Sequence, residues 1–175
     1  QQVIVPRKGV LELQRLMSGE GDVELQLGSN HIRIELDGIR FTSKLIDGRF
    51  PEYERVIPQD TSNHLTADRQ LLRGALQRTA ILSNEKYRGI RLIIRDGGVI
   101  LQAHNPEQEE AEEELEVSYK GEHIEIGFNV NYLLDALGAI DSDEVILAVV
   151  DGNSSCLLQM PGNEDCKYVV MPMRL

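Results

Sequence analysis

The chain of 175 residues lacks the features of secreted and membrane proteins. Its two cysteines, Cys156 and Cys166, are too few for a disulfide framework and stand in no metal-binding spacing, which predicts reduced structural thiols. No segment approaches the roughly 20 apolar residues that a membrane span needs. The start, QQVIVPRKGV, has no apolar signal core. We therefore expect a globular, cytoplasmic protein that is not bound to a membrane.

Patterns of catalytic and metal-binding residues are also missing. The histidines are far apart and none stands in a ligand motif, so satisfied or solvent-exposed histidines are favoured over a metal site. Carboxylate pairs are abundant, but there is no readable Ser/His/Asp set, Cys/His pair, P-loop or dinucleotide fingerprint. The sequence predicts a non-catalytic protein without a cofactor, and an enzyme remains the alternative from a different class. The histidines are His31, His64, His104 and His123.

Positive charge is in deficit, since the formal net charge is -11. This balance argues against tight general binding of nucleic acid, which needs clustered Lys and Arg, although it leaves a local basic face open. A run of acidic residues is usually a solvated loop and strand edge, and the alternative is an electrostatic docking surface for a basic partner. The acidic residues concentrate at Glu107, Glu109, Glu110, Glu112, Glu113, Glu114 and Glu116.

The last residues, YVVMPMRL, form an apolar tail at a place where chains are commonly polar and frayed. Val169 and Val170 predict the end of a strand that faces a core. Pro172 cannot donate to a strand ladder, which leaves the two flanking methionines beside irregular backbone. Methionine adapts its shape to varied apolar ligands, so the tail also fits the wall of a surface groove that a partner fills.

Three amphipathic segments with helical periodicity repeat along the chain. Superposing Val10, Leu72 and Leu134 gives two steps of 62 residues, from 10 to 72 and from 72 to 134. Such self-similarity indicates a stacked or pseudo-symmetric architecture. The predicted start signals are Pro6 as the first helical residue, Thr66 as an N-cap with Asp68 in the first turn, and Asn129 as an N-cap.

A turn dipeptide and strand-like runs follow each predicted helix. The dipeptides Asp37-Gly38, Asp96-Gly97 and Asp151-Gly152 favour tight hairpins, because Gly and Asp tolerate positive φ. Each helix would pack on one face of antiparallel strands, which predicts an α+β fold of three units. Because three units make an odd count and the chain opens within the pattern, we expect it to be the C-terminal part of a longer protein. The strand-like runs are HIRIEL, IRFTSKL, IRLIIR, VILQAH, VILAVV and SSCLLQM, with further strands at Glu112 to Tyr119 and His123 to Phe128.

Several long stretches carry a resemblance to a known family. They are VPRKGV (Val5 to Val10), FTSKLIDGRFPEYERVIP (Phe41 to Pro58), AILSNEKYRGIRL (Ala80 to Leu92), NPEQEEAEEEL (Asn105 to Leu115), IGFNVNYLLDAL (Ile126 to Leu137) and YVVMPMRL. Spread in the family's order over the whole chain, they resemble the bacterial processivity clamp, the beta subunit of the replicative DNA polymerase. The resemblance implies a DNA-clamp fold in which three domains per subunit, each of two helix-plus-strands units, close head to tail as a homodimer around duplex DNA. Residues 1–51 would be the C-terminal half of the middle domain, and residues 52–175 the C-terminal domain.

The resemblance implies a non-catalytic sliding clamp that tethers the polymerase by topology and reads no DNA sequence. Basic helix faces would then meet phosphates, often through water. A solvated helix face is the alternative for each arginine, and Arg7 and Lys8 are the stronger candidates because they match family positions. The candidate DNA-binding residues are Arg7, Lys8 and Arg15 on the first helix and Arg69 and Arg73 on the second, where Gln77 continues the same face.

In this family the acidic run lies at the dimer interface, where it faces basic residues of the other subunit's first domain. Buried apolar anchors would carry most of the affinity, and the charges would steer and orient the partner. We expect the chain not to close a ring by itself. The implied interface residues are Ile81 and Leu82 as anchors, with Glu107, Glu109, Glu110, Glu112 and Glu113.

The tail in this family lines a groove that binds short linear peptides of the DNA polymerase, the clamp loader and repair polymerases. Apolar walls would take Leu or Phe side chains, while a few polar groups fix the peptide's direction. Asn153 stands where family members often carry an apolar residue, which would alter one wall. A free-standing peptide-binding module without a ring is the alternative function. The implied groove residues are Pro51, Arg55, Val56, Asn129, Tyr132, Gly152, Asn153, Ser155, Val169, Met171, Pro172, Met173 and Arg174.

Overall fold

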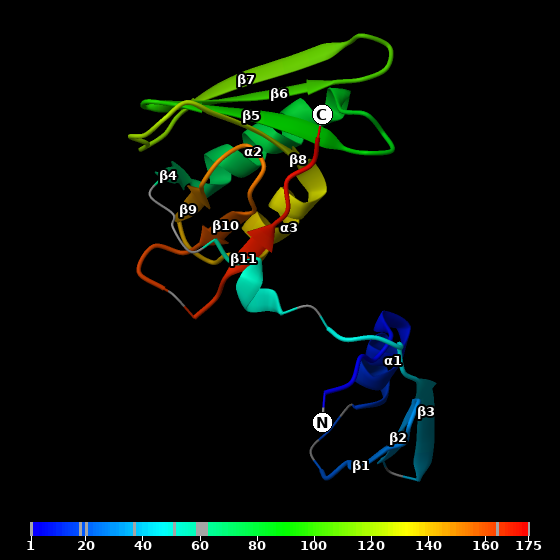
Figure 1. Cartoon of the computed structure of the whole chain (residues 1–175). Coiled ribbons are helices and arrows are strands. Elements are labelled where there is room, and N and C mark those ends of the chain that lie inside the picture. The colour runs from blue at the N-terminus through cyan, green and yellow to red at the C-terminus, as the bar shows by residue number, and fades with distance from the viewer. Residues whose placement is uncertain are drawn as a thin grey trace. The chain divides into compact units, whose positions relative to one another are not determined.

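The chain divides into two compact units, Gln1–Glu52 and Tyr53–Leu175 (Figure 1). The computed structural model describes residues 2–17, 19, 21–36, 38–50, 52–58, 63–163 and 165–174. Within these ranges, no helix has the length and apolar character needed to cross a membrane.

The first unit packs one helix on one sheet. Helix α1 (Arg7–Leu16) lies against a three-stranded antiparallel sheet ordered β1-β2-β3 (Glu24–Leu27, His31–Leu36 and Ile39–Lys44). Alternation along β2 directs Ile32, Ile34 and Leu36 into the core under the apolar face of α1. Pro6 is the N-cap residue, one position before the place predicted for it.

The second unit contains the same strand–helix–three-strand pattern twice. Two short 3-10 helices, η1 (Tyr53–Arg55) and η2 (Ala80–Leu82), precede β4 and follow α2. The first copy is β4 (Asn63–Asp68), α2 (Arg69–Thr79), β5 (Gly89–Arg95), β6 (Gly98–His104) and β7 (Glu110–Glu116). The second copy is β8 (Ile124–Asn129), α3 (Val130–Ala139), β9 (Glu144–Val149), β10 (Cys156–Gln159) and β11 (Tyr168–Val170).

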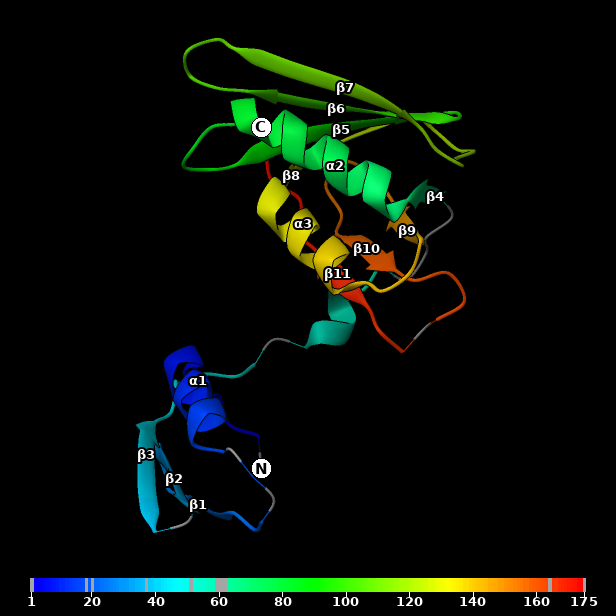
Figure 2. The ribbon, with the colours of Figure 1, turned by 180° about the vertical axis from the view of Figure 1, so that it is seen from behind.

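The two copies exchange their first strands. Strand β4 pairs with β9 in a sheet ordered β11-β10-β9-β4, and β8 pairs with β5 in a sheet ordered β7-β6-β5-β8. Helices α2 and α3 lie next to each other on one side of the unit, as Figure 2 shows from behind. Side chains of both sheets and both helices form one core, in which Phe128 is the largest fully buried residue. The predicted α+β class with antiparallel strands is confirmed.

The helical repeat is present, but the predicted superposition is one residue out at the third helix. From α1 to α2 the helix starts are 62 residues apart, 7 to 69, and from α2 to α3 they are 61 apart, 69 to 130. Leu133 is therefore the equivalent of Leu72, and both are only 1% exposed. Leu134, the residue chosen from the sequence, is half-buried at the edge of the core.

The start of α2 differs from the prediction. Thr66 lies inside β4, where it is opposite Ile146, and Asp68 is the N-cap residue. The carboxylate of Asp68 accepts a hydrogen bond from the Leu71 amide at 2.9 Å. Thr66 was the wrong choice because pairing with β9 keeps the backbone extended through residue 68. At α3, Asn129 is the N-cap residue, as predicted.

The three turn dipeptides have different outcomes. Gly97 connects β5 to β6 with φ of 72°, and Gly38 precedes β3 with φ of 77°. Asp37 lies outside the described residues. Asp151-Gly152 does not make a tight hairpin, since the loop between β9 and β10 runs from residue 150 to residue 155. Gly152 is needed there for a close contact with β8.

Candidate functional site

The C-terminal tail lies along the free edge of β8. Strand β11 pairs with β10, with Val169 opposite Leu157. Beyond β11 the tail crosses to β8, where the Met173 amide donates to the Gly127 carbonyl at 2.8 Å. The other edge of β8 pairs with β5, where Gly127 is opposite Arg91. The tail is thus an ordered wall beside the sheet.

The loop between β9 and β10 contacts the same edge of β8. A Cβ atom on Gly152 would lie 2.3 Å from the Glu125 carbonyl oxygen, so only glycine fits this approach. The Asp151 carboxylate accepts hydrogen bonds from the amides of Asn153 and Ser154, each at 2.7 Å. These bonds, first of all the one from Asn153, lower the pKa of Asp151. The loop is thus held against β8, the strand that the Met173 amide also contacts.

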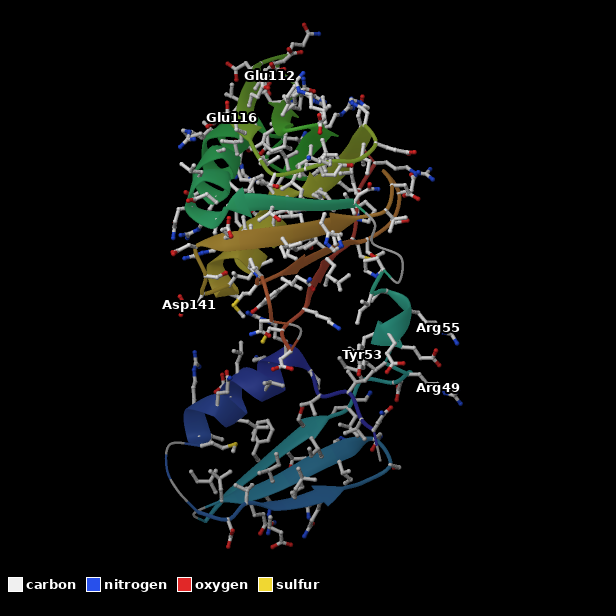
Figure 3. All side chains as sticks on the ribbon, turned by 90° about the vertical axis from the view of Figure 1, so that its left-hand side faces the viewer. Arg49, Tyr53, Arg55, Glu112, Glu116 and Asp141 are labelled. Atoms are coloured by element: carbon white, nitrogen blue, oxygen red, sulfur yellow. The ribbon has the colours of Figure 1, made fainter. Side chains whose placement is uncertain are left out.

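The loop also holds the segment that follows η1. The Ser155 hydroxyl donates to the Val56 carbonyl at 2.6 Å. Val56 and Arg55 are exposed, and Figure 3 shows the Arg55 side chain projecting from η1. Pro51, the remaining groove candidate from this stretch, lies outside the described residues.

Two of the predicted groove residues, one on α3 and one in the tail, are exposed side chains. Tyr132 on α3 is 60% exposed and Met171 is 58% exposed. Pro172 is half-buried between the two methionines. The Asn129 side chain already makes hydrogen bonds within the fold. Its oxygen accepts from the Asn131 amide at the start of α3, and its amide donates to the Tyr87 carbonyl at 3.2 Å.

Two hollows lie beside Met173 and Arg174, and we call the larger one the tail hollow. The tail hollow has a volume of about 430 Å³ and brings four of the predicted groove residues together. The smaller hollow has a volume of about 280 Å³. The tail hollow is lined by Arg91, Glu125, Ile126, Gly127, Gly152, Asn153, Met173 and Arg174. The smaller one is lined by Asn84, Tyr87, Gly89, His104, Met173 and Arg174.

Arg91 and Glu125 are site residues that the sequence reasoning missed. Both lie on strands whose neighbouring positions are buried, so strand alternation alone indicates that their side chains face away from the core. Their position beside the tail depends on the pairing of β5 with β8 and on the Met173–Gly127 hydrogen bond. Neither of these contacts has a local signal in the sequence.

The predicted DNA-binding residues of α1 are on its surface. Arg7 and Lys8 are exposed in the first turn. Arg15, in the last turn, donates to Glu12 at 3.0 Å. The first turn of α1 therefore offers two cations close together.

The predicted residues of α2 are in different surroundings. Arg69 donates through Nε to the Ser142 carbonyl at 2.6 Å and through Nη1 to the Leu137 carbonyl at 3.3 Å, and so ties the start of α2 to the end of α3. Arg73 is half-buried, and its Nε has no hydrogen-bond partner among the described residues. Gln77 is exposed.

The acidic run forms the edge strand β7 and the turn before it. Glu112 accepts from Gln102 at 2.7 Å, Glu113 is paired with Arg78, and Glu109 accepts from Asn105 at 2.7 Å. The pairing with Glu113 raises the pKa of Arg78. Figure 3 shows Glu112 and Glu116 on β7. The other predicted interface residues are Glu107 and Glu110, both exposed, Ile81, which is 73% exposed, and Leu82, half-buried in η2.

In the part of the chain that the structure describes, no three His, Cys, Asp or Glu side chains gather where they could hold a metal ion. Both cysteines are free thiols. Cys156 is buried in β10, and burial raises the pKa of its thiol to about 12. Cys166 is exposed in the loop before β11.

Residues 54–174 match the family described as the DNA polymerase III beta subunit, C-terminal domain, and residues 1–52 match the central domain of that subunit. The beta sliding clamp of Pseudomonas putida is 59% identical over 175 residues, which cover 99% of this chain and 48% of that protein. The chain thus spans about half the length of the curated relatives it matches.

Solved structures with high similarity are clamps as well. The sliding clamp of Pseudomonas aeruginosa bound to griselimycin has 57% sequence identity and a TM-score of 0.83, over 100% of this chain and 48% of that one. The pol III beta of Caulobacter crescentus has 43% identity and a TM-score of 0.86, over 99% of this chain and 47% of that one. On fold, sequence and domain order together, the chain belongs to the beta subunit family of bacterial DNA polymerase III, the beta sliding clamps.

Proposed function

We propose that the chain is part of a sliding clamp, a ring around duplex DNA that confers processivity on the replicative polymerase. The unit Tyr53–Leu175 would be the last domain of the clamp subunit, and the unit Gln1–Glu52 the second half of its middle domain. Membership of the beta subunit family supports this assignment, as does the greater length of the relatives. A non-catalytic role and a place in the cytoplasm belong to the same proposal.

The observation that carries the proposal is the ordered tail. Met173 is fixed on β8 by its amide, the Gly152 loop lines the same hollow, and Met171 in the tail is exposed. Apolar walls with a few polar groups suit a linear peptide, whose apolar side chains gain from burial while polar groups set its direction. The groove would dock such peptides from the polymerase, the clamp loader and repair polymerases.

Contacts with DNA are proposed for the basic helix residues. Arg7 and Lys8 suit phosphate contacts best, because they are exposed and adjacent. Arg69 suits them less, since two of its guanidinium nitrogens already donate to backbone carbonyls. A loading assay on circular DNA with the complete protein tests encirclement and separates a clamp from a peptide-binding module without a ring.

A head-to-tail homodimer is proposed for the complete subunit. Ile81 would be its apolar anchor, because it is the most exposed apolar side chain near β7. Glu110 and Glu107 would face a basic partner surface. Glu113 already pairs with Arg78 and would contribute less.

A peptide titration tests the groove. A fluorescein-labelled synthetic peptide with Leu and Phe anchors is titrated with the wild-type chain, with Met173→Ala and with a chain that ends at Val170. Loss of the Met173 thioether side chain, which a docked peptide would bury further, should weaken binding by about 1–2 kcal/mol, and loss of the tail by more. Met17→Ala, which removes an exposed methionine of the first unit, is the matched control and should bind like the wild type. Unchanged affinity in both tail variants would refute the groove.

A further inference from the structure

Four Asp-Gly dipeptides occur in the chain, and such pairs can undergo a reaction of the main chain with a side chain. The glycine amide nitrogen can attack the carboxyl carbon of the aspartate, since glycine has no side chain that hinders the approach. The reaction needs a glycine amide that is free of hydrogen bonds and a carboxyl group that can turn towards it. The dipeptides begin at Asp37, Asp47, Asp96 and Asp151. Asp37 lies outside the described residues, and the structure shows the surroundings of the other three.

The turn between β5 and β6 protects Asp96-Gly97. The Gly97 amide donates to the Tyr119 carbonyl at 3.1 Å, and the Gly97 carbonyl accepts from the Val117 amide at 3.1 Å. Attack of the Gly97 nitrogen on the Asp96 carboxyl group would break the first of these hydrogen bonds. Asp96 therefore reacts only when the turn opens.

The β9–β10 loop protects Asp151-Gly152 in a different way. The Asp151 carboxylate accepts hydrogen bonds from the amides of Asn153 and Ser154, each at 2.7 Å, and these bonds lower its pKa. An ionised carboxylate is a poor electrophile, because its negative charge repels the lone pair of the attacking nitrogen. The close contact of Gly152 with the Glu125 carbonyl also restricts rearrangement of the backbone.

Asp47-Gly48 has none of these restraints. Both residues are exposed, and with the described residues the Gly48 amide and the Asp47 carboxylate form no hydrogen bond or ion pair. Ile46 is bridged to Ile4, so the unpaired backbone begins directly after it. Gly48 has φ of 127°, and no atom lies within 4 Å of the position that a Cβ would take. The two reacting groups are therefore free to approach each other.

We propose that Asp47-Gly48 is a modification site, at which Asp47 is converted first to a succinimide and then to isoaspartate. The Gly48 nitrogen bonds to the Asp47 carboxyl carbon, and the carboxyl hydroxyl leaves as water with the amide proton. A second water opens the ring at the former main-chain carbonyl, so that the main chain runs through the side-chain carbonyl of Asp47. No oxidant or reductant is consumed, and the inference does not depend on the proposed clamp function.

Isoaspartate adds one methylene to the main chain and leaves a free carboxylate directly on the Cα of residue 47. That carboxylate would make the chain a substrate for the class of methyltransferase that esterifies isoaspartyl groups. The added length falls close to the boundary between the two units, in a stretch that pairs with no strand. Connections tolerate changes of length better than strands do, so the modified chain should stay folded.

The test incubates the full chain for several weeks at mildly acidic pH, where part of the carboxyl groups is protonated, once folded and once in guanidinium chloride. Peptide mass spectrometry with electron-transfer fragmentation locates succinimide and isoaspartate at each Asp-Gly pair. A protein isoaspartyl methyltransferase with a labelled methyl donor counts the modified sites. The proteins are the wild type, Asp47→Glu, whose longer side chain disfavours ring closure, and the matched control Asp96→Glu.

In the folded wild type, isoaspartate should accumulate at Asp47 about fivefold faster than at Asp96 or Asp151, a factor that one protecting hydrogen bond can supply. In guanidinium chloride the three rates should become similar, because the protecting contacts are lost. Asp47→Glu should lower the methyl count of the folded chain, and Asp96→Glu should leave it unchanged. Equal rates at the three pairs of the folded chain, faster reaction at Asp96 or Asp151, or no product at Asp47 would overturn the inference and leave the clamp proposal intact.

Discussion

Replacing Gly152 by alanine should separate the β9–β10 loop from β8. The added Cβ would lie 2.3 Å from the Glu125 carbonyl oxygen, whereas carbon and oxygen atoms in contact lie about 3.3 Å apart or more. The obstructing atom is backbone of a strand paired with β5, so it cannot rotate away as a side chain would. The loop must therefore move by roughly 1 Å.

The displacement should destabilise the Tyr53–Leu175 unit by about 1–3 kcal/mol, the usual cost of an extra methyl group in a packed site. Loss of the Ser155–Val56 hydrogen bond would add about 1 kcal/mol. Peptide binding should weaken as well, because Gly152 and Asn153 line the tail hollow.

The matched control is Gly138→Ala, which makes the same chemical change on the exposed side of α3. No atom lies within 4 Å of the Cβ it would add, so higher helix propensity should stabilise this variant by about 0.5–1 kcal/mol. Amide hydrogen exchange in β5 and β8 reports on the second unit alone and should move in opposite directions for the two variants. Wild-type exchange and wild-type peptide affinity in Gly152→Ala would refute the close-contact argument.

Three further predictions concern α2, the β9–β10 loop and the thiols. Asp68→Ala should lower the free energy of unfolding by about 1 kcal/mol because α2 loses its N-cap, and Asp68→Asn should stay near the wild type; equal urea midpoints for all three would contradict the cap. Asp151→Ala should be less stable than the wild type at neutral pH. The difference should vanish as pH falls below 3.8, the ordinary pKa of an aspartate, and through the lowered pKa of Asp151, because the carboxylate stabilises the fold only while ionised. A difference that grows in urea titrations at acid pH would contradict this. Only Cys166 should react with a thiol reagent in the folded chain and Cys156 only in urea, so two fast equivalents from the folded chain would rule out the buried thiol.

Features with local causes could be predicted from the sequence. The hairpin at Asp96-Gly97 follows from a glycine with positive φ between two strands of alternating apolar residues. The start of α3 follows from Asn129, whose side chain caps the helix. These signals act within a few residues, so no knowledge of distant contacts is needed to find them.

Features with distant causes were misread or missed. Strand β4 contains Thr66 and Asp68, both good capping residues, and only its pairing with β9 decides which of them starts the helix. Gly152 looks like a turn residue, but its function is a close approach to β8. Arg69 donates to carbonyls more than 60 residues away, and these two hydrogen bonds have no local signal in the sequence.

The prediction of a groove depended on the family resemblance more than on residue patterns. Apolar composition at the C-terminus indicated one wall, but the β9–β10 loop also lines the tail hollow, and no local signal connects that loop to the tail. Arg91 could have been identified as a residue beside the tail only from the register of β5 against β8. The alternation of its own strand indicates only that its side chain faces away from the core.

Because β4 and β8 are exchanged between the two halves of the second unit, neither half can complete a four-stranded sheet alone. Asn63 is opposite Val149, so β4 can form its hydrogen bonds only with a strand about 80 residues later in the chain. Such long-range closure must occur before its hydrogen bonds contribute, which slows folding and makes it all-or-none. During synthesis β4 would leave the ribosome without a partner until β9 has followed it, so the unit gains its stability only once nearly all of it has been made.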